Sequence, residues 1–385
     1  MKLCVITCYN QPDYVRAVTL RAAAGRIDDV DVIIVKNRRT GLMRYLEVFA
    51  ATLVARLKHK PDVYLLTFRG YEMLLPVRLL SLGKPLIYDE FINPIEWVVK
   101  EQRQVEAKQT SMAWYRLLVA LVSKVIVSIV ASWPFRKFYQ LLLRSVDVVL
   151  ADTASHADIS AELTETPREK IVDIPVGVDE DMFHDEAPEE IENEIFTVFY
   201  YGNMLPLHGL EYVIEAAVKM NHEAVRFVLV GGNAKVAHDV ALAVGNGANI
   251  DYRAWVDFDK LPALMRQADL CLAGPFGGTF QAEYVITGKA YQYLAMGRPT
   301  VIGMNHESDI FTHQKNALIV RQANADPLVE AIRWGMNHRS ELRAIGTSGR
   351  KIYEKRYATQ HLVEKLGKVL AGFSATGDAA PDAKK

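Results

Sequence analysis

The chain has 385 residues, half of them hydrophobic, and this length predicts two domains rather than one core. Its formal net charge of −1 is unevenly distributed: residues 1–150 hold 22 Lys and Arg against 13 Asp and Glu, and the remainder holds 23 against 33. The basic first half favours an anionic partner, either a membrane or a nucleic acid. Three cysteines lie in apolar runs without metal-ligand spacing, so we expect reduced core residues and no metal site.

Short apolar runs recur along the chain. Between most of them lie segments whose apolar residues recur with the period of an α-helix. The first run is too short for a signal peptide and predicts a buried strand. The strands predicted in the first half are Leu3–Thr7, Val30–Val35, Val63–Thr67, Pro85–Tyr88, Val146–Ala151 and Ile171–Ile174. Those predicted in the second half are Phe196–Tyr201, Val225–Val230, Ile250–Arg253, Leu270–Ala273, Thr300–Ile302 and Ala317–Val320. This alternation predicts an α/β protein of two doubly wound domains with parallel sheets.

The expected domain boundaries follow from this series. Residues 1–177 form the first domain and residues 178–350 the second, with the acidic stretch 179–194 as the natural connector. Residues 351–371 are predicted to form a helix that packs back on the first domain. Residues 372–385 are small and polar without periodicity, which predicts a disordered tail.

Two segments of the first half are unusually apolar. Residues 42–57 have a helical pattern with basic residues at both ends, and residues 117–135 contain one charge, Lys124. A crossing there would leave strands of one sheet on opposite sides of a bilayer. We therefore expect a helical segment, about 112–143, that lies in the membrane interface with basic residues near anionic lipid. The alternative is a buried helical hairpin.

Residues 277–302 predict a loop, a helix over Thr287–Met296 and a buried strand. Gly297 is placed to end the helix, and Pro299 follows it. The first amides of such a helix, near Thr287 and Gly288, form a site for an anion such as a diphosphate. Lys289 adds charge, and Gln292 faces the same side one turn later. The alternative is an ordinary αβ unit with a solvated Lys and Gln.

Four stretches resemble one known family. Its interdomain segment is similar to KIVDIPVGVDEDMF (170–183), and the opening of its nucleotide-sugar domain is similar to FYYGNMLPLHGLEYVIEAA (199–217). Its next strand with a glycine turn is similar to VRFVLVGG (225–232). Its donor site is similar to WVDFDKLPALMRQADLCLAGP (255–275) followed by GKAYQYLAMGRPTVIG (288–303). The chain thus resembles the retaining family 4 glycosyltransferases, which implies the GT-B fold of two Rossmann-like domains facing across a cleft.

The resemblance implies a donor site in the second domain. The donor-site residues expected in this chain are Gly202, Asn203, His208, Glu283, Thr287, Gly288, Lys289 and Gln292, of which Glu283 is one place out of register with a usual glutamate. Asn203 and His208 stand where family members usually have an Arg and a Lys, and Gln292 replaces one of two usual glutamates. Lys289 and a protonated His208 are expected to replace the lost charge. The alternative for His208 is a helix N-terminal residue without a ligand.

In the first domain the family often has a catalytic or orienting His after the fourth strand. This chain has Asp89 and Glu90 there, followed by Phe91. Because functional residues gather at the carboxyl ends of such strands, Asp89 and Glu90 are predicted to be catalytic, together with His208. The alternative is a solvated pair of carboxylates.

The predicted protein is a cytoplasmic hexosyltransferase of glycan biosynthesis, peripheral on the cytoplasmic face of the membrane. Its partners are a nucleotide-diphosphate sugar and a lipid-linked glycan acceptor, and no metal or cofactor is expected. Retention of configuration is implied by the resemblance alone. The main alternative is a catalytically weak or inactive scaffold for another transferase. A sugar-nucleotide epimerase or phosphorylase of similar architecture fits less well because of the lipid-facing segment. A nucleic-acid-binding protein fits less well because the basic residues alternate with long aliphatic runs rather than stacking aromatics.

Overall fold

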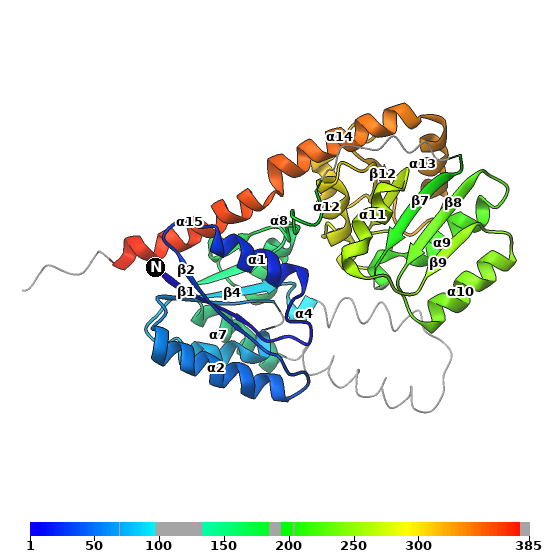
Figure 1. The fold of residues 1–385 in the computed structure, drawn as a ribbon. Helices are drawn as coiled ribbons and strands as arrows, with labels where there is room; N and C mark the ends of the chain where they lie inside the picture. The colour runs from blue at the N-terminus through cyan, green and yellow to red at the C-terminus, as the bar shows by residue number, and fades with distance from the viewer. Residues whose placement is uncertain (69, 97–132, 185–193, 203–204, 378–385) are drawn as a thin grey trace, which may run out of the picture. The chain divides into compact units, whose positions relative to one another are not determined.

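The computed structural model describes residues 1–68, 70–96, 133–184, 194–202 and 205–377 (Figure 1). Its contacts divide the chain into two compact units. Unit 1 comprises Met1–Gly177 and Thr359–Lys385, and unit 2 comprises Val178–Ala358. The chain therefore leaves unit 1 after Gly177 and returns to it at Thr359.

Unit 1 contains a parallel six-stranded sheet in the order β2-β1-β3-β4-β5-β6. Its strands are β1 Lys2–Thr7, β2 Asp31–Lys36, β3 Val63–Leu66, β4 Leu86–Phe91, β5 Val148–Ala151 and β6 Ile171–Asp173. The chain winds outward from β1 to β2 and then in the other direction from β3 to β6. The winding direction thus changes between β1 and β3.

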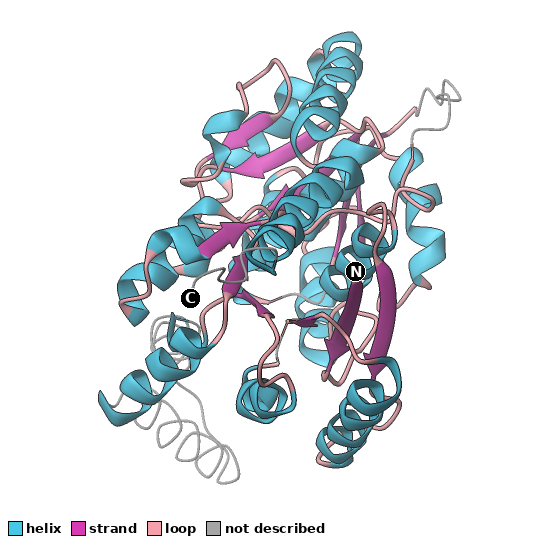
Figure 2. Ribbon diagram, turned by 90° about the vertical axis from the view of Figure 1, so that its left-hand side faces the viewer, coloured by secondary structure: helices cyan, strands magenta, loops and turns pink. Residues whose placement is uncertain are grey.

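Helices cover both faces of this sheet, because alternate strand residues point to opposite sides (Figures 1 and 2). Leu3 and Val5 of β1 pack with α1 (Val15–Gly25) and α15 (Thr359–Gly377). On the other face, Cys4 and Ile6 belong to a core with α2, α3, α7 and α8. These helices span Met43–His59 (α2), Leu74–Leu80 (α3), Trp133–Ser145 (α7) and Ala154–Thr164 (α8), and the short α4 is Pro94–Glu96.

Unit 2 repeats the arrangement with the strand order β12-β11-β10-β7-β8-β9. Its strands are β7 Phe196–Tyr201, β8 Val225–Val230, β9 Ile250–Arg253, β10 Leu270–Gly274, β11 Thr300–Gly303 and β12 Leu318–Val320. Its helices are α9 Leu210–Lys219, α10 Ala234–Gly245, α11 Leu261–Arg266, α12 Gly288–Ala295, α13 Asp326–Asn337 and α14 Arg339–Arg356. Here the winding direction changes between β7 and β10, which in open α/β sheets is where ligands bind.

The predicted fold class is confirmed, with two parallel sheets of alternating strands and helices. Three boundaries differ from the prediction by more than two residues. β4 continues to Phe91, so Asp89 and Glu90 lie within the strand and do not follow it. The helix that packs on unit 1 begins at Thr359 and not at residue 351, because α14 continues to Arg356 within unit 2. Residues 372–377 of the predicted disordered tail belong to helix α15.

Most of the predicted interfacial segment, residues 112–132, lies outside the described residues. Its last part, up to residue 143, is within α7. Over the described ranges, no helix is long and apolar enough to cross a membrane.

Candidate functional site

The loops at the carboxyl ends of β7 and β8 approach each other unusually closely. Gly231 has φ +102°, and a Cβ there would lie 2.1 Å from the carbonyl oxygen of Gly202. A second close approach joins the turn before α9 to the loop after β10, where a Cβ at Gly277 would lie 2.0 Å from the oxygen of Pro206. The Gly277 amide also donates to the Leu207 carbonyl at 2.9 Å. Because glycine has no side chain, Gly231 and Gly277 allow the loops after β7, β8 and β10 to pack closely where the winding direction of the sheet changes.

Helix α12 begins at this place. Thr287 precedes it in an extended conformation, and its Oγ1 donates to the Ala273 carbonyl of β10 at 2.9 Å. Since this hydroxyl makes no capping hydrogen bond, the first turn of α12 keeps free backbone N–H groups. Gly288 is exposed, and a Cβ there would have no neighbour within 4 Å. The positive end of the helix dipole therefore opens to solvent, as an anion site requires.

Two nitrogen-bearing side chains converge beside that opening. A Cβ on Gly202 would lie 3.4 Å from Lys289 Nζ and 3.5 Å from His208 Nδ1. Lys289 is 4% exposed, and its Nζ lies 5.3 Å from the centroid of the Tyr200 ring. Among the residues that the structure describes, no carboxylate pairs with Lys289. His208 Nδ1 is buried and has no hydrogen-bond partner among the same residues.

Burial sets the charge state of both groups. It lowers the pKa of Lys289 to about 7, because an ammonium loses its hydration there. The pKa of His208 falls well below its usual value, first through burial and then through repulsion by Lys289. Burial thus favours the neutral form of His208 at physiological pH, and its predicted positive charge toward a donor stays a prediction. Lys289 is the group that titrates near neutrality.

The other predicted donor-site residues do not all lie at the start of α12. Gln292 is buried, and its Oε1 accepts a hydrogen bond from the hydroxyl of Tyr201 on β7. Glu283 is exposed in the short helical turn Gln281–Glu283, and its carbonyl accepts from the His306 amide at 3.0 Å. Asn203 lies outside the described residues. The structure thus brings Gly202, His208 and Lys289 together at the start of α12 and fixes Gln292 one turn further along it.

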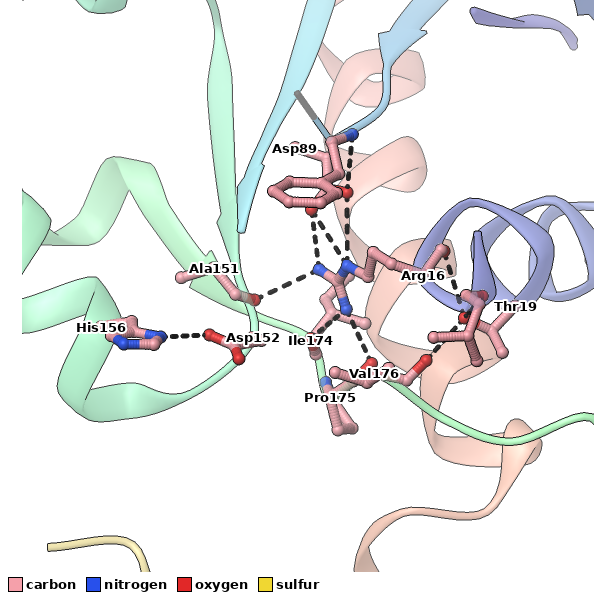
Figure 3. A network of polar contacts seen from close by, with 11 residues as sticks. Arg16, Thr19, Asp89, Ala151, Asp152, His156, Ile174, Pro175 and Val176 are labelled. Carbon is pink, nitrogen blue, oxygen red and sulfur yellow. Dashed lines mark hydrogen bonds and ion pairs between the residues drawn. The ribbon is translucent and has the colours of Figure 1, made fainter. Parts of the chain in front are cut away.

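Asp89 of unit 1 lies in a buried network, shown in Figure 3. Arg16 of α1 donates to Asp89 Oδ1 from Nη2 at 2.8 Å and from Nε at 3.1 Å. The same guanidinium donates from Nη1 to the carbonyls of Ile174 and Pro175, at 2.5 and 2.7 Å. Burial raises the pKa of Asp89, and the Arg16 guanidinium opposes that rise. The carboxylate thus joins α1, β4 and the segment that follows β6.

Glu90 is buried as well and accepts hydrogen bonds from several side chains. Its donors include the hydroxyl of Tyr139 at 2.6 Å, the amide of Asn93 at 3.0 Å and the hydroxyl of Ser160. The alternative of a solvated pair is therefore wrong, since neither carboxylate is exposed. The contacts around Asp89 and Glu90 are structural, and their catalytic role stays a prediction.

Sequence reasoning missed Arg16 and Tyr201. Arg16 lies on the buried face of α1, three and four residues before Thr19 and Leu20, and a charge at such a spacing signals a buried partner. Tyr201 gave no such signal, because aromatic residues are common in strands. Over the described ranges, no group of three or more His, Cys, Asp or Glu side chains is placed to hold a metal ion.

Part of the chain matches a known protein family. Residues 195–338 match the family described as "Glycosyl transferases group 1". The putative colanic acid biosynthesis glycosyl transferase WcaI of Escherichia coli (strain K12) is 30% identical over 141 residues, which is 35% of this chain and 34% of that protein. The match thus spans about a third of that relative's length.

Solved structures resemble the whole chain. The structure of sucrose-phosphate synthase from Thermosynechococcus elongatus matches 98% of this chain and 100% of its own chain, with a TM-score of 0.69 and 14% identity. The structure of Anabaena Alr3699/HepE in complex with UDP-glucose matches 97% of this chain and 100% of its own chain, with a TM-score of 0.68 and 14% identity. The chain therefore has the GT-B glycosyltransferase fold, and its segment 195–338, which contains His208 and Lys289, has the sequence character of the group 1 glycosyl transferases.

Proposed function

We propose that the protein is a glycosyltransferase that moves a hexose from a nucleotide-diphosphate sugar to a membrane-proximal acceptor, a lipid-linked glycan. The observation that carries this proposal is the buried ammonium of Lys289, which lies beside His208 and Gly202 at the open start of α12. An uncompensated cation is costly to bury, so its presence is best explained by an anionic ligand that completes the site. The match of residues 195–338 to group 1 glycosyl transferases supports a sugar nucleotide as that ligand.

The donor diphosphate would receive two kinds of contact. The first amides of α12 and the ammonium of Lys289 supply positive charge from one side. Neutral His208 donates a hydrogen bond from its protonated ring nitrogen. Gly202 carries no side chain between these groups, which lets a phosphate approach them closely.

These contacts suit the leaving group of a glycosyl transfer. The acceptor hydroxyl oxygen forms a bond to the anomeric carbon, and the bond from that carbon to the diphosphate oxygen breaks. Its electron pair stays on the diphosphate, which also takes the proton of the acceptor hydroxyl. We propose that attack comes from the face the diphosphate leaves, with retention, and that Lys289 and the helix amides stabilise the departing charge without a metal ion.

The same proposal includes a location. A lipid-linked acceptor requires the protein to work at a membrane, and sugar nucleotides as co-substrates place it on the cytoplasmic face. In this reading the protein needs no cofactor, and its partners are the donor, the acceptor and an anionic lipid surface.

A second candidate is a scaffold protein with little or no activity. It is favoured by Gln292, an amide that is bound to Tyr201 at a position where the resemblance implies a carboxylate. Release of the nucleoside diphosphate separates the two candidates, because a scaffold can bind a sugar nucleotide but does not turn it over.

The test is a panel of sugar nucleotides in a thermal-shift assay, followed by product release with lipid-linked glycan acceptors. A donor at about 100 times its dissociation constant should stabilise the protein by about 2.7 kcal/mol. Lys289→Ala should abolish that shift and turnover together, and Lys235→Ala should change neither, because Lys235 is exposed and paired with Asp239. Unchanged donor affinity in Lys289→Ala would exclude the proposed phosphate site.

A further inference from the structure

The helical layer formed by α2, α3 and α7 in unit 1 exposes an unusual amount of apolar surface. Helix α2 is apolar on two sides. Val48, Thr52 and Ala55 are buried against the sheet, and a second stripe points outward. This outward stripe consists of Leu42, Leu46, Phe49, Leu53 and Leu57. Its spacing of three and four residues keeps these side chains on one line along the helix.

The neighbouring helices continue this surface. α3 packs against α2 and also against α7, so the three helices form one layer over the same face of the sheet. Leu75 and Leu79 of α3 are exposed, as are Trp133, Phe138 and Leu141 of α7. Trp133 is 70% exposed and Leu46 is 65% exposed. A patch of this extent on an outer surface marks an interaction site rather than scattered surface residues.

The charges of the layer are nearly all positive. Its basic residues are Arg44, Arg56, Lys58, Arg78, Arg136, Lys137 and Arg144, and its acidic residue is Glu47. Two of the cations are partly neutralised from outside the layer, Lys137 by Glu165 at 3.1 Å and Arg78 by Asp147 at 3.5 Å. Of the other five, Arg44 donates to Asn10 Oδ1 at 2.8 Å and Arg56 donates to the Leu80 carbonyl. Among the described residues, Lys58, Arg136 and Arg144 form no ion pair with a carboxylate. By contrast, helix α8, which covers the same face of the sheet, contains Asp158 and Glu162 and no Lys or Arg.

We propose that the outward face of α2, α3 and α7 docks on a bilayer that contains anionic lipid. The exposed leucines and aromatic residues would lie among the acyl chains near the headgroups, and the surrounding lysine and arginine side chains would contact lipid phosphates and carboxylates. This proposal extends the membrane setting of the proposed function, but it does not depend on sugar transfer.

Charge complementarity favours a bilayer over a second copy of the chain. A symmetric dimer would place this face against itself and bring the two sets of cations together, which disfavours association. An anionic bilayer supplies both an apolar interior and a dense layer of negative charge. Self-association through this face is therefore an outcome that the experiment must detect.

The experiment uses the full chain and a single reactive thiol. The native cysteines, Cys4, Cys8 and Cys271, are all buried, so an exposed introduced cysteine can be labelled selectively with an environment-sensitive fluorophore. The test variant is Leu46→Cys on α2. The matched control is Leu242→Cys on α10 of unit 2, an equally apolar residue that is 57% exposed. Each is mixed with vesicles of phosphatidylcholine alone or with phosphatidylserine, in the absence of any sugar nucleotide.

We expect the probe at position 46 to brighten and shift to the blue with phosphatidylserine vesicles, to respond less to phosphatidylcholine alone and not to respond at position 242. Leu46→Gln with Phe49→Gln should weaken vesicle partitioning by more than about tenfold, because several buried methylene groups are lost. Lys58→Gln with Arg144→Gln should remove much of the preference for phosphatidylserine and leave residual binding. Circular dichroism of each variant checks that the fold is kept.

Three results would overturn the proposal. Vesicle binding that is unchanged in Leu46→Gln with Phe49→Gln would place membrane contact elsewhere. A probe at position 46 that is already blue-shifted in buffer would show that another segment of the chain covers the face. A dimer in sedimentation that these same substitutions dissociate, without vesicle binding of the native chain, would make the face an interface between copies. Loss of sugar transfer in a variant that still binds vesicles would bear only on the proposed function.

Discussion

The two units differ in whether a buried cation has a carboxylate partner. In unit 1, Arg16 and Asp89 are both fully buried, and every contact of the guanidinium shown in Figure 3 ends on an oxygen atom of the same unit. In unit 2, Lys289 is nearly as buried, but among the described residues no carboxylate pairs with its ammonium, which lies near the Tyr200 ring and His208. The charge of Arg16 is thus paired within unit 1, whereas the ammonium of Lys289 at the start of α12 has no counter-charge among the described residues.

This difference indicates what each charge does. A buried pair with good geometry offsets its own desolvation and fixes how elements pack, here α1 against β4 and the chain after β6. A buried cation without a counter-charge destabilises the fold and is tolerated where a ligand supplies the missing charge. The two networks should therefore respond to substitution with opposite signs.

The largest effect is expected in unit 1. Asp89→Ala should lower the free energy of unfolding by about 3–5 kcal/mol, because it leaves the guanidinium of Arg16 buried without its partner. Urea denaturation followed by circular dichroism measures the change. Asp239→Ala, which removes the exposed partner of Lys235, is the matched control and should leave stability unchanged. The double variant Arg16→Met with Asp89→Leu should recover part of the loss, and no recovery would mean that packing, not charge, is the cause.

The opposite sign is expected for Lys289→Met. The pKa of Lys289 is lowered from its usual value to about 7 by burial, so the unfolded chain binds more protons than the folded chain between about pH 7 and pH 10. Below that window the folded state carries the full cost of a buried charge. Replacing the ammonium by an apolar chain should raise the free energy of unfolding at pH 7 by roughly 2–4 kcal/mol and abolish donor binding. A destabilised Lys289→Met protein would show that Lys289 is already paired within the fold.

These two networks also mark the limit of sequence reasoning. The strands of unit 2 were predicted almost to the residue, β7 and β8 among them, because largely apolar runs specify buried strands. Helix α12 was predicted from Thr287, Gly297 and Pro299, since caps are local signals. The pairing of Arg16 with Asp89 joins residues 73 positions apart, and no local pattern reports such a contact.

The same limit applies to the charge state of His208. Its position before a glycine turn suggested a donor-site residue, and the structure does place it beside Lys289. Its charge state could not be predicted, because the burial of a side chain depends on which loops fold over it. The loops that contain Gly231 and Gly277 are distant from each other in the sequence, and each packs against the segment that follows β7, at Gly202 and at Pro206.

A third and smaller effect is the pH dependence of donor affinity. Since the pKa of Lys289 is about 7 and a bound diphosphate raises it, donor binding takes up a proton above neutrality. Affinity should be greatest below pH 7 and fall by about 16-fold between pH 7 and pH 8.5 if the pKa of the complex lies above that range. Isothermal titration calorimetry in buffers of different ionisation heat measures both the affinity and the proton uptake. Lys289→Arg should flatten the profile, because a guanidinium stays charged, and an equally steep profile in that variant would assign the titration to another group.

The smallest effect should belong to His208, which acts as a neutral donor because burial and Lys289 hold its pKa well below the usual value. Loss of one neutral hydrogen bond costs about 0.5–1.5 kcal/mol, so His208→Ala should weaken donor binding by about 2- to 13-fold. His208→Asn keeps an N–H donor of similar size and should retain most of the affinity. Neither substitution should remove the fall in affinity with rising pH, since Lys289 causes it. His208→Ala should instead move the fall to higher pH, because water admitted beside Lys289 relieves part of the desolvation that lowers its pKa. If His208→Asn, with Lys289 in place, loses the pH dependence of donor affinity, then His208 and not Lys289 is the group that titrates and carries the charge.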